Sequence, residues 1–226
     1  MSELAVSVKN MSFKVGSKQI LSEITFDVRK GSVYGVVGHN GAGKTTLFHL
    51  LLGLKFQMSG EISIFGRSNF DYKSRLNLGY VPERPYINLE FSLYNFLNFH
   101  ANLAGISSGQ KESTIQTAAI SVGLGANLDQ ELSTFSKGML QKSLLAQAVL
   151  GDPDFLILDE PMSGLDPEAR ESVRQQIVAL KEKGKTLIFS SHAHDDVAQL
   201  ADHVLAIKAG RVDFSGSVKE WEGSRK

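Results

Sequence analysis

A glycine-rich stretch constrains the fold of this chain more than any other part of its sequence. It matches the phosphate-binding loop pattern of Gly, four residues, Gly, Lys, and then Ser or Thr. Its glycines let the backbone curl so that successive N–H groups point at an anion. The stretch consists of Gly38, His39, Asn40, Gly41, Ala42, Gly43, Lys44, Thr45 and Thr46.

The residues on both sides of this loop agree with phosphate binding. Residues 32–37 are predicted to form a short buried strand, and residues 45–52 an apolar helix whose N-terminus faces the phosphates. Lys44 supplies a point charge for the β- and γ-phosphates, and the Thr45 hydroxyl is placed to ligate Mg²⁺. The alternative is a glycine-rich loop that binds nothing, and the strand before it and the helix after it argue against that.

Length and charge exclude several classes of protein. At 226 residues the chain suits one large domain, or one domain with an inserted subdomain. Its 24 basic and 24 acidic residues give no sign of a nucleic-acid partner. The lack of cysteine excludes disulfides and thiolate metal sites and suits the cytosol. The first residues lack a secretion signal, and no apolar run approaches the ~20 residues that span a bilayer.

The order of strand and helix patterns indicates the fold class. Residues 4–8, 11–15 and 24–28 are short and β-rich, which predicts antiparallel strands, and residues 60–66 and 77–81 are two further strands. A mainly helical block follows, with Ser92 placed to cap its first helix, a second helix over residues 112–122 and a third. The residues expected on the inner faces of the first and third helices are Leu93, Phe96, Leu97, His100, Leu103, Leu140, Leu144, Leu145 and Ala148.

Strands alternate with helices in the last third of the chain. Residues 155–158 form a continuous apolar run, as expected for a strand buried on both faces of a parallel sheet. Asp166 caps the next helix with Pro167 at its first position, and Gly184 ends it. The remaining predictions are a strand at residues 185–189, a short helix, and strands near residues 204–207 and 211–214.

These patterns predict an α/β fold. We expect a P-loop NTPase (RecA-like) core with an N-terminal antiparallel β-subdomain and an inserted α-helical subdomain. Residues 1–226 are interpreted as one domain, with its core at residues 1–84 and 151–226 and the helical subdomain at residues 85–150.

Two carboxylates and a histidine follow buried strands. Asp159, at the end of the apolar strand and downstream of the phosphate loop, is expected to hold Mg²⁺. Alternation along a strand points Glu160 away from Asp159, which suits a general base aimed at the attacking water. His192 ends the neighbouring strand and is placed to reach the γ-phosphate or that water. A metal pair of His192 and His194 is disfavoured because no third ligand is present.

Further motifs make the chain resemble the ATP-binding subunit of an ATP-binding cassette (ABC) transporter over essentially its whole length. The segment Phe-Ser-Lys-Gly-Met at residues 135–139 resembles the family's Leu-Ser-Gly-Gly-Gln signature, and Ser-Gly-Leu-Asp at residues 163–166 resembles its D-loop. The site residues that the resemblance implies here are Ser136, Lys137, Gly138 and Met139 in the signature and Ser163 and Asp166 in the D-loop. A generic P-loop kinase or GTPase would not carry the signature.

The signature has a physical interpretation of its own. Ser136 and Gly138 lie at the start of an apolar helix, where a hydroxyl, N–H groups and the helix dipole form an anion site. One chain thus presents two phosphate-binding surfaces. The resemblance implies that the signature acts in trans across a head-to-tail dimer, which closes on ATP and opens after hydrolysis. A homodimer suffices, and pairing with a second cassette stays open.

Several positions depart from the family pattern. Phe135, Lys137 and Met139 replace Leu, Gly and Gln of the signature, a variant that resembles subunits of exporters for drugs, polysaccharides or lipids. Glu83 replaces the family's Q-loop glutamine and is expected to ligate Mg²⁺ or orient water while adding negative charge. Where the family has an aromatic residue against adenine the chain has Val15, and Phe13 on the same face of the strand either stacks instead or belongs to the core.

The start of the helical block is the predicted partner surface. Tyr86, Phe91, Tyr94 and Phe99 add aromatic density that a small helical subdomain does not require, whereas Phe96 is interpreted as core. In the family this region is a groove that receives a coupling helix of the membrane subunit. Tyr94→Ala is predicted to uncouple the ATPase from that subunit.

The sequence therefore predicts an ATPase subunit, with ATP and Mg²⁺, that powers a membrane exporter from the cytoplasmic face of the cell membrane through a transmembrane permease. Lys44, Glu160 and His192 are the predicted catalytic residues, and Thr45, Asp159 and Glu83 the metal ligands. The alternatives are a soluble cassette ATPase acting on nucleic acid or protein complexes, and a non-hydrolysing regulatory cassette. Tandem cassettes and basic extensions, typical of the first, are not seen, and retention of the catalytic residues argues against the second.

Overall fold

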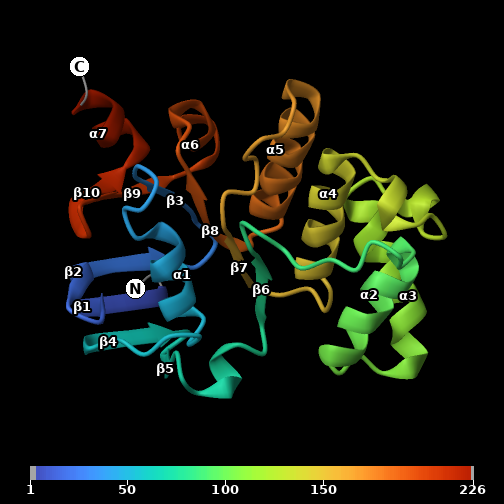
Figure 1. Ribbon diagram of the computed structural model, residues 1–226, viewed down its shortest axis with the longest axis horizontal. Helices are drawn as coiled ribbons and strands as arrows, with labels where there is room; N and C mark the ends of the chain where they lie inside the picture. The colour runs from blue at the N-terminus through green and yellow to red at the C-terminus, as the bar shows by residue number, and fades with distance from the viewer. Residues whose placement is uncertain (1–3, 225–226) are drawn as a thin grey trace.

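The computed structural model describes residues 4–224 and arranges them as two β-sheets and a block of helices (Figure 1). Residues 1–3, on which the expected lack of a secretion signal partly rests, lie outside this range. The smaller, antiparallel sheet has the order β2 (Lys18–Arg29), β1 (Leu4–Val15), β4 (Ser59–Ile64), β5 (Arg67–Ser68). The larger sheet has the order β10 (Arg211–Ser217), β9 (His203–Lys208), β3 (Val33–Val37), β8 (Thr186–Ser191), β7 (Phe155–Leu158), β6 (Leu78–Val81).

All neighbouring strands of the larger sheet are parallel except β10, which pairs antiparallel with β9. The α-helices are α1 (Lys44–Leu51), α2 (Leu93–Leu103), α3 (Ser108–Ser121), α4 (Lys137–Ala148), α5 (Pro167–Glu182), α6 (His194–Leu200) and α7 (Val218–Gly223). Short 3₁₀ turns occur at Tyr72–Ser74, Gly125–Asn127 and Leu132–Thr134. None of the helices within residues 4–224 is long and apolar enough to cross a membrane.

Strand β7 shows why the larger sheet sits between two apolar layers. All four of its residues are buried. Phe155 and Ile157 face a core that β7 shares with α1 and the smaller sheet, so α1 lies between the two sheets (Figure 1). Leu156 and Leu158 face the opposite core, which the helices cover. Burial of such side chains stabilises the fold by roughly 1.5–3 kcal/mol each, and the continuous apolar run predicted here is confirmed.

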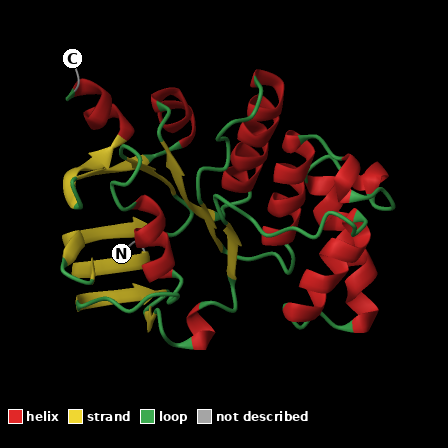
Figure 2. Cartoon of the chain, viewed as in Figure 1, coloured by secondary structure: helices red, strands yellow, loops and turns green. Residues whose placement is uncertain are grey.

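The helical block lies between β6 and β7 in the chain, and in Figure 2 that stretch contains only helices and loops. Ser92 caps α2 as predicted, because its hydroxyl accepts a hydrogen bond from the Asn95 N–H at 3.2 Å. Leu103 was expected on the buried face of α2, which was wrong: this last residue of the helix is 70% exposed, while Ala101 is buried. Helix α4 packs against both α2 and α5 and so joins the block to the sheet.

Two local details differ from the sequence prediction. The two short strands expected at residues 4–8 and 11–15 form one strand, β1, because a bulge rather than a turn separates them. Asn10 takes a left-handed backbone (φ 48°) in this bulge, and its N–H donates to the Thr25 hydroxyl at 2.9 Å. Helix α7 was not predicted, and it is fixed by a capping box between Ser217 and Glu220. The predicted α/β fold class, with its antiparallel subdomain and helical insertion, is confirmed.

Candidate active site

The phosphate loop runs from the end of β3 to the start of α1 and is closely packed. A Cβ atom on Gly38 would lie 2.6 Å from the Ile207 carbonyl oxygen. Gly43 combines a left-handed φ of 110° with a space in which a Cβ would lie 2.6 Å from Cδ2 of Leu21. Both positions therefore require glycine. Gly43 also leaves the first N–H groups of α1 without a side-chain cap, which suits binding of an anion.

Lys44 is held at the base of this loop. Its side chain is only 6% exposed, and its Nζ donates to the Gly38 carbonyl at 2.8 Å. The same Nζ lies 3.1 Å from Oε1 of Glu160. Thr45 and Thr46 follow in α1 and are half-buried, whereas His39 and Asn40 are exposed at the tip of the loop. The loop thus presents its backbone and one ammonium group toward the end of β7.

Asp159 is nearly fully buried directly after β7. The Ser190 hydroxyl, at the end of the neighbouring strand β8, donates to Oδ1 of Asp159 at 2.6 Å and accepts the Glu160 N–H at 2.7 Å. Oδ2 of Asp159 has no hydrogen-bond partner among residues 4–224. A buried carboxylate oxygen without a partner fits a group that ligates Mg²⁺ or one of its waters. Ser190 was not singled out from the sequence, although its place at the end of a strand beside β7 is a signal that it would lie there.

Glu83 is exposed on the segment after β6, and its charge acts on the same tyrosine as that of Asp159. Burial raises the pKa of Tyr80 to about 12, and the charges of Asp159 and Glu83 both add to this shift. Both acidic groups are therefore close enough to act on one phenol. No group of three His, Cys, Asp or Glu side chains within residues 4–224 is arranged to hold a metal ion. Mg²⁺ commonly needs only one or two carboxylates besides phosphate and water, so the buried, unpartnered carboxylate oxygen of Asp159 fits it.

Glu160 connects the phosphate loop to the histidine after β8. Its side chain is 8% exposed, and Oε2 lies 3.0 Å from Nδ1 of His192, which is 58% exposed. The predicted reason for its orientation was wrong: β7 ends at Leu158, and the left-handed backbone of Glu160 (φ 49°), not strand alternation, sets its direction. Lys44, Glu160 and His192 thus form one continuous set of polar contacts.

The signature residues form a separate surface at the start of α4, well apart from α1 in Figure 1. The Ser136 hydroxyl caps α4 by accepting the Met139 N–H at 3.2 Å. A Cβ on Gly138 would lie 2.6 Å from that of Ala169, so this glycine allows α4 and α5 to approach closely. Ser136 and Lys137 are exposed.

The D-loop lies beside the signature in the same chain. Nζ of Lys137 donates to the Gly164 carbonyl at 3.0 Å, so a residue that departs from the family signature connects the two motifs. Asp166 caps α5 as predicted, with its side chain accepting the Ala169 N–H at 2.9 Å. The Ser163 N–H donates to the Glu160 carbonyl at 3.0 Å, which links the D-loop to the end of β7.

The structure also places the residues considered as adenine contacts and as the docking surface for a partner. Phe13 is half-buried against the core of the smaller sheet, with Nζ of Lys55 5.7 Å from its ring, and Val15 is 59% exposed.

In the helical block Tyr86 and Phe99 are exposed, 107% and 51%, whereas Phe91 and Tyr94 pack partly against the core. The Tyr94 hydroxyl donates to Glu112 at 2.8 Å. His194 stacks on Trp221 of α7, with ring centroids 4.9 Å apart.

Comparison with known proteins assigns the family. The family model described as "ABC transporter" matches residues 21–163. The chain is 37% identical to an uncharacterised ABC transporter ATP-binding protein of Synechocystis over 206 residues, which are 90% of this chain and 58% of that protein. It is 30% identical to the Nod factor export ATP-binding protein I of Cupriavidus metallidurans, over 95% of this chain and 72% of that protein. The chain therefore spans less than two thirds of the length of the first of these relatives.

A solved structure agrees with this assignment. CbiO1 of Clostridium perfringens, described as part of the ABC transporter complex CbiONQ, superposes with a TM-score of 0.88 at 26% identity, over 99% of this chain and 92% of that one. The match covers both sheets and the helical block. This chain is an ATP-binding domain of the ABC transporter family.

Proposed function

We propose that this chain hydrolyses ATP and thereby powers export by a membrane transporter. The observation that carries the proposal is the contact of Glu160 with both Lys44, at 3.1 Å, and His192, at 3.0 Å. A phosphate-binding cation beside a carboxylate and an imidazole, either of which can act as a general base, suits phosphoryl transfer to water. The export direction is supported by the relative named for Nod factor export and by the Ser-Lys-Gly-Met signature.

Each residue has a role in this proposal. The loop backbone and Lys44 bind the β- and γ-phosphates, while Glu160 accepts a proton from the attacking water. His192 donates to the γ-phosphate or helps to hold that water. Thr45, Asp159 and Glu83 would hold Mg²⁺, which when bound neutralises charge on the phosphates.

The remaining parts of the proposal concern assembly. Ser136, Lys137, Gly138 and Met139 would meet the γ-phosphate of a second copy in a homodimer, since α4 lies well apart from α1 of the same chain (Figure 1). Residues 1–84 and 151–226 would act as the core, and residues 85–150 as the helical subdomain. A permease would dock against the Tyr86, Phe91, Tyr94 and Phe99 region, which places the chain on the cytoplasmic face of a membrane. Phe13 or Val15 would contact adenine.

Release of phosphate from Mg-ATP by the purified chain tests the enzymatic part. The wild type is expected to hydrolyse ATP, Glu160→Gln to bind ATP without hydrolysing it, and Lys44→Ala to bind it weakly. Glu61→Gln changes an exposed glutamate on β4 and is the matched control, with wild-type activity expected. ATP binding by the wild type without hydrolysis would contradict the proposal and favour a regulatory cassette.

A further inference from the structure

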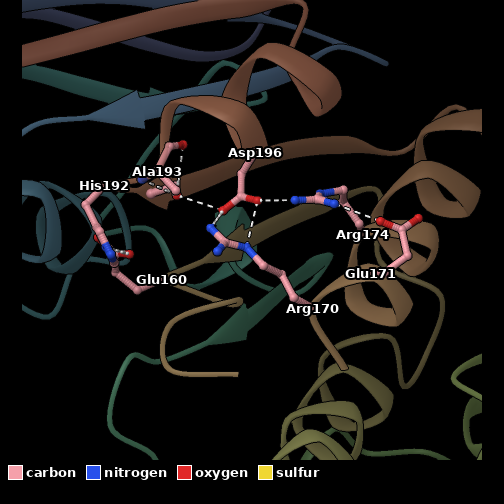
Figure 3. A network of polar contacts seen from close by, with 8 residues as sticks. Glu160, Arg170, Glu171, Arg174, His192, Ala193 and Asp196 are labelled. Carbon is pink, nitrogen blue, oxygen red and sulfur yellow. Dashed lines mark hydrogen bonds and ion pairs between the residues drawn. The ribbon is translucent and has the colours of Figure 1, made fainter. Parts of the chain in front are cut away.

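A buried carboxylate, Asp196, joins helix α5 to helix α6 beside the active site (Figure 3). Its side chain is 1% exposed, and both of its oxygens accept hydrogen bonds from arginines of α5. Arg170 donates from Nε at 3.0 Å and from Nη2 at 2.6 Å, and Arg174 donates from Nη2 at 2.8 Å. Burial alone would raise the pKa of Asp196, but the hydrogen bonds from the two arginines outweigh burial and keep the pKa below its ordinary value. Asp196 is therefore an anion in the folded protein.

This carboxylate also holds the loop that carries His192. The Ser191 hydroxyl, at the end of β8, donates to Oδ2 of Asp196 at 3.2 Å and accepts the Ala193 N–H at 3.0 Å. The residues before and after His192 are thus fixed through one hydroxyl group. In Figure 3 the Glu160 and His192 pair lies directly beside this arrangement.

The other end of the arrangement leads to the D-loop. Arg170 lies in the first turn of α5, and its N–H donates to the Asp166 carbonyl at 2.9 Å. A small cavity of about 50 Å³ separates the D-loop from the histidine, and its lining includes Ser163, Arg170, His192 and Glu160. A shift of the start of α5 would therefore move Arg170 and, through Asp196 and the Ser191 hydroxyl, the backbone on both sides of His192.

Stability alone gives no sufficient account of this network. Replacing a buried ion pair by apolar residues is often neutral or stabilising, so a buried carboxylate between two partly exposed arginines is weak support for a purely stabilising role. His192 is 58% exposed, and among residues 4–224 its side chain makes a polar contact with Glu160. Its direction depends on the backbone of residues 191–193, which Asp196 holds.

We infer that Asp196 is a positioning residue that sets His192 against Glu160 and connects this pair to the D-loop through Arg170. The inference rests on the proposed ATPase function. Asp196 contacts neither phosphate nor water in this account and acts only through the backbone around His192. A displacement of about 1 Å in a positioned group can reduce a rate by ~10²-fold, so loss of this link should lower kcat while leaving the phosphate loop, and hence the KM for ATP, unchanged.

The test uses two substitutions of different severity. Asp196→Asn removes the charge and leaves two arginines without their carboxylate, so it is expected to destabilise the fold. Arg170→Met removes two hydrogen bonds and leaves Arg174 to neutralise Asp196, so it is the variant expected to fold. The matched control is Lys181→Met, which removes another ion pair of α5, that with Asp202 at 2.6 Å, away from His192.

Three measurements on these variants decide the inference. Arg170→Met should lower kcat about 10- to 100-fold at constant KM, shift the NMR signals of the His192 imidazole, and have no further effect on kcat in a His192→Ala background. Lys181→Met should change none of these. Wild-type kcat and an unshifted imidazole in Arg170→Met would overturn the inference, as would an equal fall in the His192→Ala background. If the wild type does not hydrolyse ATP, the proposed function fails, and the imidazole signals alone then decide the inference.

Discussion

The ammonium group of Lys44 and the carboxylate of Glu160 form one ion pair, 3.1 Å apart and almost completely buried, between the phosphate loop and the end of β7. Glu160 therefore neutralises the cation that is proposed to bind the phosphates of ATP. The residue proposed as the base that activates water competes with the substrate for the same charge. In the proposed function, ATP binding and hydrolysis would thus be coupled through one side chain.

This coupling predicts opposite effects of Glu160→Gln on binding and on hydrolysis. Removing the negative charge frees Lys44 for phosphate, so ATP should bind roughly tenfold more tightly, a change of about 1.4 kcal/mol. Loss of a general base should slow hydrolysis by about 10²–10⁴-fold. Titration calorimetry and phosphate release measure the two effects. Weaker ATP binding by this variant would show that Glu160 does not compete for Lys44.

A second prediction concerns the shape of the phosphate loop. Gly43→Ala places a Cβ 2.6 Å from Leu21 at a φ of 110°, which should destabilise the fold by about 1–3 kcal/mol and abolish ATP binding. Gly16→Ala is the control, because Gly16 also has a left-handed φ (57°) but has open space around it and lies outside the loop. It should lose some stability and keep ATP binding. Chemical unfolding measures the stability of both variants, and ATP titration measures their binding. Their comparison separates the backbone strain that both variants share from the contact with Leu21 that only Gly43→Ala makes. Normal ATP binding by Gly43→Ala would refute the described loop.

A third prediction concerns acid stability. Asp196 has a pKa below its ordinary value in the folded protein, so its stabilising contribution is present above the pKa of the unfolded chain. That contribution is lost as the pH falls through the folded pKa, which places the effect below about pH 4. Guanidinium unfolding between pH 2.5 and 6 should show a steeper loss of stability at the acid end for the wild type than for Asp196→Asn. Equal slopes would show that Asp196 does not titrate in this way.

A fourth prediction concerns docking to a membrane partner. Tyr86 and Phe99 are exposed, whereas Tyr94 packs partly against the core, so the double substitution Tyr86→Ala, Phe99→Ala is a cleaner test than Tyr94→Ala. It should leave ATP hydrolysis and unfolding unchanged and reduce the fraction of the chain that sediments with membranes of the native host. Ile120→Ala, an exposed apolar residue of α3, is the control. Undiminished sedimentation of the double variant would place the docking surface elsewhere.

The position of the motif residues at one edge of the larger sheet was predictable from the sequence. Asp159, Glu160 and His192 directly follow buried strands, and Lys44 ends the loop that follows another. Parallel strands bring their carboxyl ends to one edge of the sheet. The order of apolar runs also predicted the two-sided burial of β7. These features depend on local periodicity and on short spacings, which a single sequence shows directly.

The residues that hold the motifs in place were not predictable. Asp196 meets Arg170 and Arg174 across sequence separations of 26 and 22 residues, and only the packing of α5 against α6 brings them together. Ser190, which touches both Asp159 and Glu160, has no spacing pattern of its own. The left-handed backbone of Glu160 likewise depends on the surrounding contacts and not on its residue type.

The central claim, that the phosphate loop of one copy closes on the signature of another, is tested most directly by the solution mass of Glu160→Gln. Light scattering with and without Mg-ATP should show a monomer that becomes a dimer only with Mg-ATP, and Ser136→Ala in the same background should weaken that dimer. The mass of a monomer in the presence of Mg-ATP, with ATP binding shown separately, would contradict the claim.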